Sequence, residues 1–103
     1  MPALQLHTGT LRRAAGRATS LLRVLANEDR LLLLCQLAQG EKCVGELEDL
    51  LGIRQPTLSQ QLGVLRSEGL VVTRRHGKRI YYRERDDEAL AVLHSLYAIY
   101  CGR

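Results

Sequence analysis

Residues 44–82 read VGELEDLLGIRQPTLSQQLGVLRSEGLVVTRRHGKRIYY. A short amphipathic pattern ends at Gly52, and a second helical pattern begins after it. The inner face of this second helix carries leucines at spacings of four and three residues: Leu58, Leu62 and Leu65. LVVTRR and KRIYYR, rich in β-branched and aromatic residues, then lie on either side of His76-Gly77. This order predicts a helix, a turn, a second helix and a basic hairpin.

Upstream of this stretch, the pattern predicts two further helices. Small and apolar positions recur at spacings of four and three between Leu11 and Leu25, which is typical of a helix that packs on another helix. Asn27 offers a side-chain cap for the next helix, whose LLLLCQLA is apolar on most sides and therefore belongs in the core. We predict residues 1–10 to be a flexible arm and residues 11–103 to be one domain.

Downstream of the hairpin, Asp86 and Asp87 open a final helix that runs through Tyr100. This helix carries two apolar stripes, and two stripes require two surfaces, one of them in a partner subunit. The predicted fold class is mainly α with a small antiparallel hairpin, in the order four helices, two strands and one helix. Pro56 is expected at the first position of the fourth helix, where its missing N–H costs nothing.

Charge and polarity in the fourth helix and the hairpin favour a nucleic-acid partner. The chain has 103 residues and a net charge of +4, with cations concentrated in the hairpin. Glutamines can pair with adenine edges in a major groove, and short hydroxyl side chains reach phosphates or thymine methyl groups. Hairpin cations would lie along the DNA backbone or the minor groove. The candidate DNA-binding residues are Gln55, Thr57, Ser59, Gln60, Gln61, Arg75, His76, Lys78 and Arg79.

Cysteine usage and hydropathy favour a cytoplasmic protein. No apolar stretch reaches the length of a membrane span, and the first residues do not read as a secretory signal. The three cysteines, Cys35, Cys43 and Cys101, are too few for a disulfide scaffold. Cys35 lies inside the apolar run LLLLCQL, so we expect it to be a core packing residue.

Three segments together carry a resemblance to a known family. They are ANEDRLLLLCQL, GELEDLLGIRQPTLSQQLGVLRSEGLVVTRRHGKRIYYR and the last helix. From Leu11 to Cys101 the chain resembles the ArsR/SmtB family of winged helix-turn-helix repressors. The resemblance implies a homodimer formed by the first and last helices, bound to an imperfect inverted repeat in double-stranded operator DNA and released from it by an inducer.

The two zinc sites typical of that family are both incomplete here. Cys43-Val44-Gly45 has the first cysteine of a Cys-x-Cys pair and a glycine in place of the second. His94 has no companion histidine on the last helix, and one histidine with scattered carboxylates does not make a tetrahedral site. We therefore predict no metal and no cofactor.

The remaining cysteines resemble the persulfide-responsive branch of the family, the BigR/SqrR-like repressors. That resemblance implies that Cys43 and Cys101 are the two reactive positions. Cys43 stands at a helix N-terminus with Glu46 three residues on, and the helix N–H groups there favour a thiolate. We predict a repressor that leaves its operator when Cys43 and Cys101 react with a persulfide or polysulfide.

Two alternatives remain open. A metal or metalloid sensor of the same fold would use Cys43 and Cys101 as soft thiolate ligands. A small thiol enzyme would also use a reactive cysteine, but it needs an apolar substrate pocket and a Cys-x-x-Cys or comparable site, and we find neither in the sequence.

Overall fold

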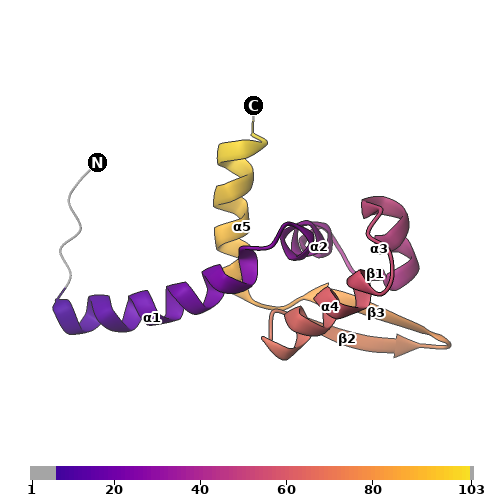
Figure 1. Ribbon diagram of the computed structural model, residues 1–103, viewed down its shortest axis with the longest axis horizontal. Helices are drawn as coiled ribbons and strands as arrows, with labels where there is room; N and C mark the ends of the chain where they lie inside the picture. The colour runs from indigo at the N-terminus through magenta and orange to yellow at the C-terminus, as the bar shows by residue number, and fades with distance from the viewer. Residues whose placement is uncertain (1–6, 103) are drawn as a thin grey trace.

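The computed structural model describes residues 7–102 and contains five helices and three strands in that range. In chain order the elements are α1 (Thr8–Leu25), α2 (Glu28–Ala38), β1 (Lys42–Cys43), α3 (Val44–Leu51), α4 (Thr57–Ser67), β2 (Val71–His76), β3 (Arg79–Glu84) and α5 (Asp87–Tyr100). Figure 1 shows α2, α3, α4 and the sheet gathered at one end, while α1 and α5 project away from them. The predicted winged arrangement of helices and hairpin is confirmed.

The helix boundaries follow from local capping. The Asn27 side chain accepts a hydrogen bond from the Arg30 N–H at 3.0 Å, and Asp86 does the same for Ala89 at 2.9 Å. Gly52 closes α3 with φ of 69°, a left-handed conformation that a side chain would strain. The caps inferred at Asn27 and Asp86, and the stop at Gly52, are confirmed.

Two predicted helix starts are displaced. Helix α1 begins at Thr8, and its first turn closes on the carbonyl of His7, so residues 8–10 are helical instead of belonging to an arm. Residues 1–6, the rest of that predicted arm, lie outside the described range. Pro56 stands just before α4, not at its first position, because the helical turns begin at Thr57.

The sheet has one strand more than the hairpin predicted from the sequence. Strand β3 lies in the middle, with β2 on one side and the two-residue β1 on the other, both antiparallel to it. Cys43 is thereby paired with Tyr81, which fixes the start of α3 against the wing. Strand β2 runs to His76, which pairs with Arg79, so the two-residue turn is Gly77-Lys78 and not the predicted His76-Gly77; the φ of 62° at Gly77 suits glycine.

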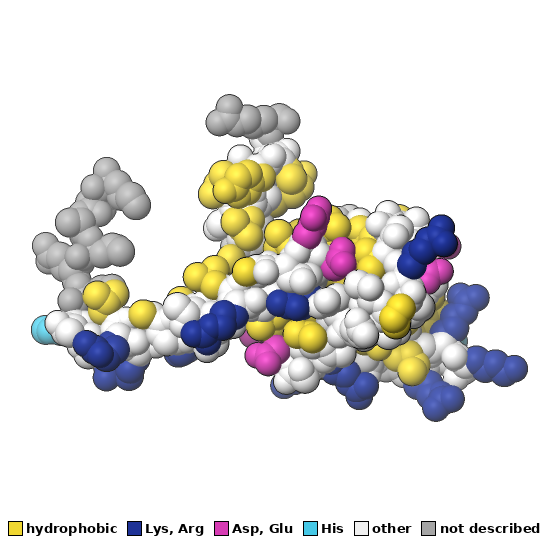
Figure 2. Space-filling view, in the orientation of Figure 1, with side chains coloured by type: hydrophobic (Ala, Val, Ile, Leu, Met, Phe, Trp, Pro, Cys, Tyr) yellow, Lys and Arg dark blue, Asp and Glu magenta, His cyan; other side chains and the backbone are white. Residues whose placement is uncertain are grey.

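The core is built around α2, which packs against α1, α3, α4 and β3. The largest fully buried side chains of this core are Leu33, Leu34, Leu47, Leu58, Leu62, Leu65 and Val71. Apolar side chains on α1 and α5 are left outside it: Leu11, Leu22, Tyr97, Ile99 and Tyr100 are 50%, 52%, 63%, 62% and 79% exposed. Figure 2 shows the exposed apolar atoms on the projecting end of α5.

Candidate nucleic-acid interface and thiol pair

The outer face of α4 is polar and uncharged where it meets solvent. Ser59 and Gln60 are exposed, while Leu58, Leu62 and Leu65 on the opposite side are buried. Gly63 has open space where a side chain would stand, so the helix surface is shallow there. A helix with a shallow polar face fits the major groove of duplex DNA.

Two of the glutamines predicted to contact DNA are already engaged within the chain. The Gln55 side chain accepts a hydrogen bond from the Ser59 N–H at 3.0 Å, which satisfies a donor in the first turn of α4. Gln61 is half-buried, and its side-chain oxygen accepts a hydrogen bond from Arg30 at 2.9 Å. A glutamine whose oxygen is held in this way cannot pair with adenine through both its oxygen and its nitrogen.

The wing presents three exposed cations and an exposed histidine. Arg75, His76, Lys78 and Arg79 are all exposed and lie at the closed end of the β2–β3 hairpin. Figure 2 shows dark blue Lys and Arg side chains at that end of the molecule and along its lower edge. Arg74 is different, because its Nε lies 2.8 Å from both carboxylate oxygens of Glu41.

Cys43 occupies the predicted N-cap position of α3, but it is buried, with 7% of its surface exposed. The Glu46 carboxylate accepts a hydrogen bond from the Cys43 N–H at 3.0 Å, and this bond is the main cause of a lowered pKa at Glu46. The thiol lies in an open groove of about 500 Å³ beside Lys78 and Arg79 of the wing.

The third thiol, Cys35 of α2, is half-buried. Burial raises the pKa of the Cys35 thiol, and negative charge on Cys101 raises it further. Cys101 itself is exposed and caps the end of α5.

A cavity of about 330 Å³ separates the two helices that carry Cys35 and Cys101. Cys35, Ala38 and Gln39 of α2 line one side, and Leu93, His94 and Tyr97 of α5 line the other. The Cys101 N–H donates to the carbonyl of Tyr97 at 2.8 Å, so Cys101 follows Tyr97 by one helical turn on the same face. Cys35 does pack against the core, as the sequence predicts, but it is only half-buried and also lines this cavity.

Comparison with known proteins fixes the family. A model described as bacterial regulatory protein, arsR family, matches residues 27–73. The biofilm growth-associated repressor of Agrobacterium fabrum is 55% identical over 92 residues, which cover 89% of this chain and 79% of that protein. The chain belongs to the ArsR family. It is a transcriptional repressor of that DNA-binding family and not an enzyme.

Solved structures of ArsR-family relatives share the whole fold. The crystal structure of the repressor BigR from Xylella fastidiosa superposes with a TM-score of 0.88 at 45% identity, covering 95% of this chain and all of that one. Reduced HlyU from Vibrio cholerae gives a TM-score of 0.83 at 38% identity, covering 88% of this chain and 96% of that one.

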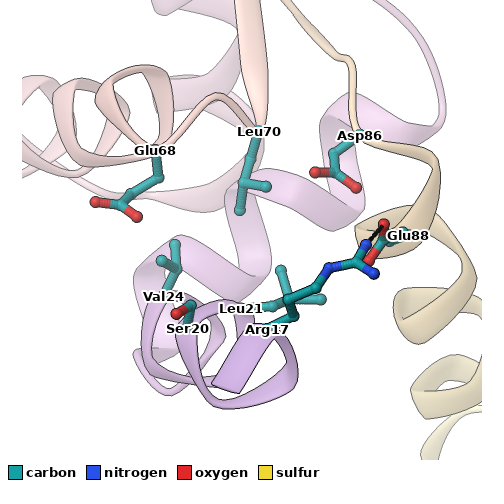
Figure 3. Close-up of a pocket in the computed structure, with 8 residues that line it drawn as sticks. All are labelled: Arg17, Ser20, Leu21, Val24, Glu68, Leu70, Asp86 and Glu88. Atoms are coloured by element: carbon teal, nitrogen blue, oxygen red, sulfur yellow. Dashed lines mark hydrogen bonds and ion pairs between the residues drawn. The ribbon is translucent and has the colours of Figure 1, made fainter. Parts of the chain in front are cut away.

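A further cavity of the ArsR-family chain lies where α1 meets the start of α5. It encloses about 300 Å³ and includes the carboxylates of Glu68, Asp86 and Glu88. Figure 3 shows Arg17 of α1 reaching across to pair with Glu88 of α5. Both side chains are mostly exposed, so this ion pair aligns the two helices without contributing much stability.

No helix within residues 7–102 combines the length and apolar character that crossing a membrane requires.

Proposed function

We propose that this chain is a dimeric, thiol-switched repressor of the cytoplasm. It binds operator DNA when reduced and releases it when Cys101 and Cys35 react with a persulfide or polysulfide. The observation that carries the proposal is the cavity between α2 and α5, which Cys35 lines on one side and Tyr97 on the other, with Cys101 one helical turn beyond Tyr97 on the same face. The proposal takes Cys35 as the second thiol of the switch, in place of Cys43, which the sequence favoured.

In this proposal α4 reads the major groove and the wing holds the backbone. Ser59 and Gln60 lie on the exposed face of α4, with Thr57 half-buried beside them, and they are the residues we assign to base and phosphate contacts. Arg75, Lys78 and Arg79 contribute affinity with little sequence information. We leave Gln61 out of the base contacts, because its side-chain oxygen is held by Arg30.

The proposed dimer is formed by α1 and α5. Both helices project from the core and carry large apolar side chains that one chain leaves exposed. A surface of this kind normally marks a protein contact. A second copy of the chain would cover it and would place two copies of α4 on the two halves of an inverted repeat.

The thiol chemistry needs no further oxidant than the persulfide. The exposed Cys101 thiolate attacks the outer sulfur of glutathione persulfide, so a Cys101 persulfide forms and glutathione leaves as its thiol. The Cys35 thiolate then attacks the inner sulfur of that persulfide, the Cys35–Cys101 disulfide forms and hydrogen sulfide leaves. Cys35 is the resolving thiol, because its raised pKa keeps it protonated for longer than an ordinary cysteine.

The bridge can reach the DNA-reading helix through α2. Helix α2 carries Cys35 and packs directly against α4, whereas Cys101 stands at the end of the projecting α5. Joining them would draw α5 toward α2 and alter the separation of the two α4 helices in the dimer. A coupling of about 1–3 kcal/mol is enough to weaken operator binding by roughly 5- to 150-fold.

The test compares three serine variants on the same operator. Cys35→Ser and Cys101→Ser should bind DNA as the wild type does and keep it after treatment with glutathione persulfide. Cys43→Ser is the matched control and should still release the DNA. Full release by Cys35→Ser, together with an absent response in Cys43→Ser, would return the switch to Cys43 and Cys101.

The alternative is a metalloid or soft-metal sensor of the same fold. Cys35 and Cys101 would supply two soft sulfur ligands for such ions, with a third ligand from the partner subunit. Release of operator by arsenite or a thiophilic metal ion, with stoichiometric ion bound and no response to persulfide, would favour this alternative.

A further inference from the structure

Arg30, in the first turn of α2, makes hydrogen bonds to two other helices. Its Nε donates to the carbonyl of Val24 at 2.6 Å, and one terminal nitrogen donates to the carbonyl of Arg23 at 3.2 Å. Its other terminal nitrogen donates to the side-chain oxygen of Gln61 at 2.9 Å. One side chain therefore connects the end of α1 with the middle of α4.

The contacts at α1 suit a cation. The carbonyls of Arg23 and Val24 belong to the last turn of α1, where carbonyls have no partner further along the helix. The C-terminal end of a helix is also the negative end of its dipole, so a guanidinium there is stabilised. The planar guanidinium holds its donors in fixed directions, so the two carbonyls fix its orientation.

The contact at α4 lies on the side away from solvent. Gln61 is half-buried, whereas its neighbours Ser59 and Gln60 are exposed on the proposed reading face. A hydrogen bond to Gln61 thus fixes the rotation of α4 about its axis without blocking that face. Helices α1 and α4 contact each other only sparsely, and Arg30 is the side chain through which they are joined by hydrogen bonds within residues 7–102.

We propose that Arg30 is a positioning residue for operator recognition. It holds the reading helix α4 at a fixed orientation to α1, and α1 is held by the partner subunit in the dimer. The pair Arg30–Gln61 thereby sets the distance and angle between the two reading helices, and with them the half-site separation that the dimer prefers. The inference rests on the proposed dimeric binding of operator DNA.

The experiment measures the preference for half-site spacing. An operator is selected with the full-length wild-type chain from duplexes with randomised cores, and versions with one base pair inserted or removed between the half-sites are then made. Arg30→Lys keeps the charge but removes the fixed fork, and Gln61→Met removes the acceptor at similar volume. Arg85→Lys, an exposed arginine between β3 and α5, is the matched control.

Both variants should bind the selected operator about tenfold more weakly, because a reading helix that is no longer held in one orientation fits both half-sites less well. Their affinity for the two altered spacings should change little, so the spacing preference shrinks. The double variant should bind no more weakly than Arg30→Lys alone, because Gln61→Met removes a bond that this variant already lacks. Arg85→Lys should keep the wild-type preference.

Two results would overturn the inference. One is an unchanged spacing preference in both single variants. The other is an equal weakening on all three duplexes that follows a fall in thermal stability, which would make Arg30 a purely structural residue. Failure of the wild type to bind any inverted repeat, or binding as a monomer, would instead contradict the proposed function.

Discussion

Glu84, at the end of β3, has a carboxyl oxygen that is buried without a hydrogen-bond partner. Burial raises the pKa of this carboxyl group, and the nearby Asp86 and Asp87 add to the shift, while a hydrogen bond from the Asp86 backbone opposes it. Because the pKa is higher in the folded state than in the unfolded state, the protonated form is favoured by folding. The stability that protonated Glu84 contributes is fully present below the pKa of about 4.3 that the group has in the unfolded chain. It is lost as pH rises through the higher pKa of the folded state.

Glu84→Gln should therefore raise the melting temperature by a few degrees at neutral pH, because it removes a charge that folding buries. The gain should vanish in acid, where the wild-type carboxyl group is already protonated. Thermal unfolding followed by circular dichroism between neutral pH and pH about 4 measures both effects. A stabilisation that is equal at both ends of this range would rule out ionisation of Glu84 as its cause.

For single residues, the chemical type of an exposed side chain was easier to predict from the sequence than its neighbours in the fold. The polar face with Ser59 and Gln60 follows from helical spacing alone, and the structure leaves it exposed. The surroundings of Gln61 and Cys35 were missed because they depend on partners from other helices. Helical period places Cys35 on one side of α2, but only the path of α5 shows that His94 and Tyr97 face that side across a cavity.

At the scale of elements, the wing separates two kinds of arginine. Arg75, Lys78 and Arg79 are exposed at its closed end, whereas Arg74 is bound by Glu41 and stacks 4.9 Å from the ring centre of Tyr81. The hydrogen bond from Arg74 lowers the pKa of Glu41, so this pair stays ionised at neutral pH. Arg74 holds β2 against the segment before β1, while the other three cations face solvent.

Replacing Arg75, Lys78 and Arg79 by glutamine should weaken binding to operator and to unrelated DNA alike. The slope of log affinity against log salt should fall by about 0.9 for each phosphate that the variant no longer neutralises. Fluorescence anisotropy with labelled duplex between low and moderate salt measures this slope. Arg74→Gln is the control and should lower thermal stability while leaving the salt slope near that of the wild type. If the triple variant keeps the wild-type slope, the wing does not contact the DNA.

Most elements could be predicted from the sequence because their signals are local. Caps at Asn27 and Asp86 and the glycine after α3 each mark a helix end within a few residues. Strand β1 was missed, since two residues carry no alternation and their pairing with β3 is a long-range event. The start of α1 at Thr8 was also missed, because residues 8–10, Thr-Gly-Thr, carry no strong helical signal of their own.

For the molecule as a whole, the proposed binding of an inverted repeat depends on a dimer formed through α1 and α5. Ile99, on the projecting part of α5, is 62% exposed in the single chain. Ile99→Glu should place a charge in the proposed interface and shift the protein to monomers. Operator binding should weaken by on the order of a hundredfold, because a monomer cannot bind both half-sites at once. Sedimentation and DNA binding on the same preparations measure the two effects.

Leu50→Glu provides the matched control for that substitution. Leu50 is 56% exposed on α3, a helix that lies apart from α1 and α5 in Figure 1. This variant should remain dimeric and bind operator as the wild type does. A wild-type chain that sediments as a monomer, or an Ile99→Glu chain that stays dimeric, would contradict the proposed interface.

The central claim is that the two thiols of the switch are Cys35 and Cys101. The most direct measurement treats reduced protein with glutathione persulfide, divides each sample, and determines operator release on one half and the linked cysteine peptides by non-reducing mass spectrometry on the other. The account predicts a Cys35–Cys101 linkage within one chain that increases in proportion to release, with Cys43 still free. Release that tracks a Cys43–Cys101 linkage, or that occurs while Cys35 remains a free thiol, would contradict it.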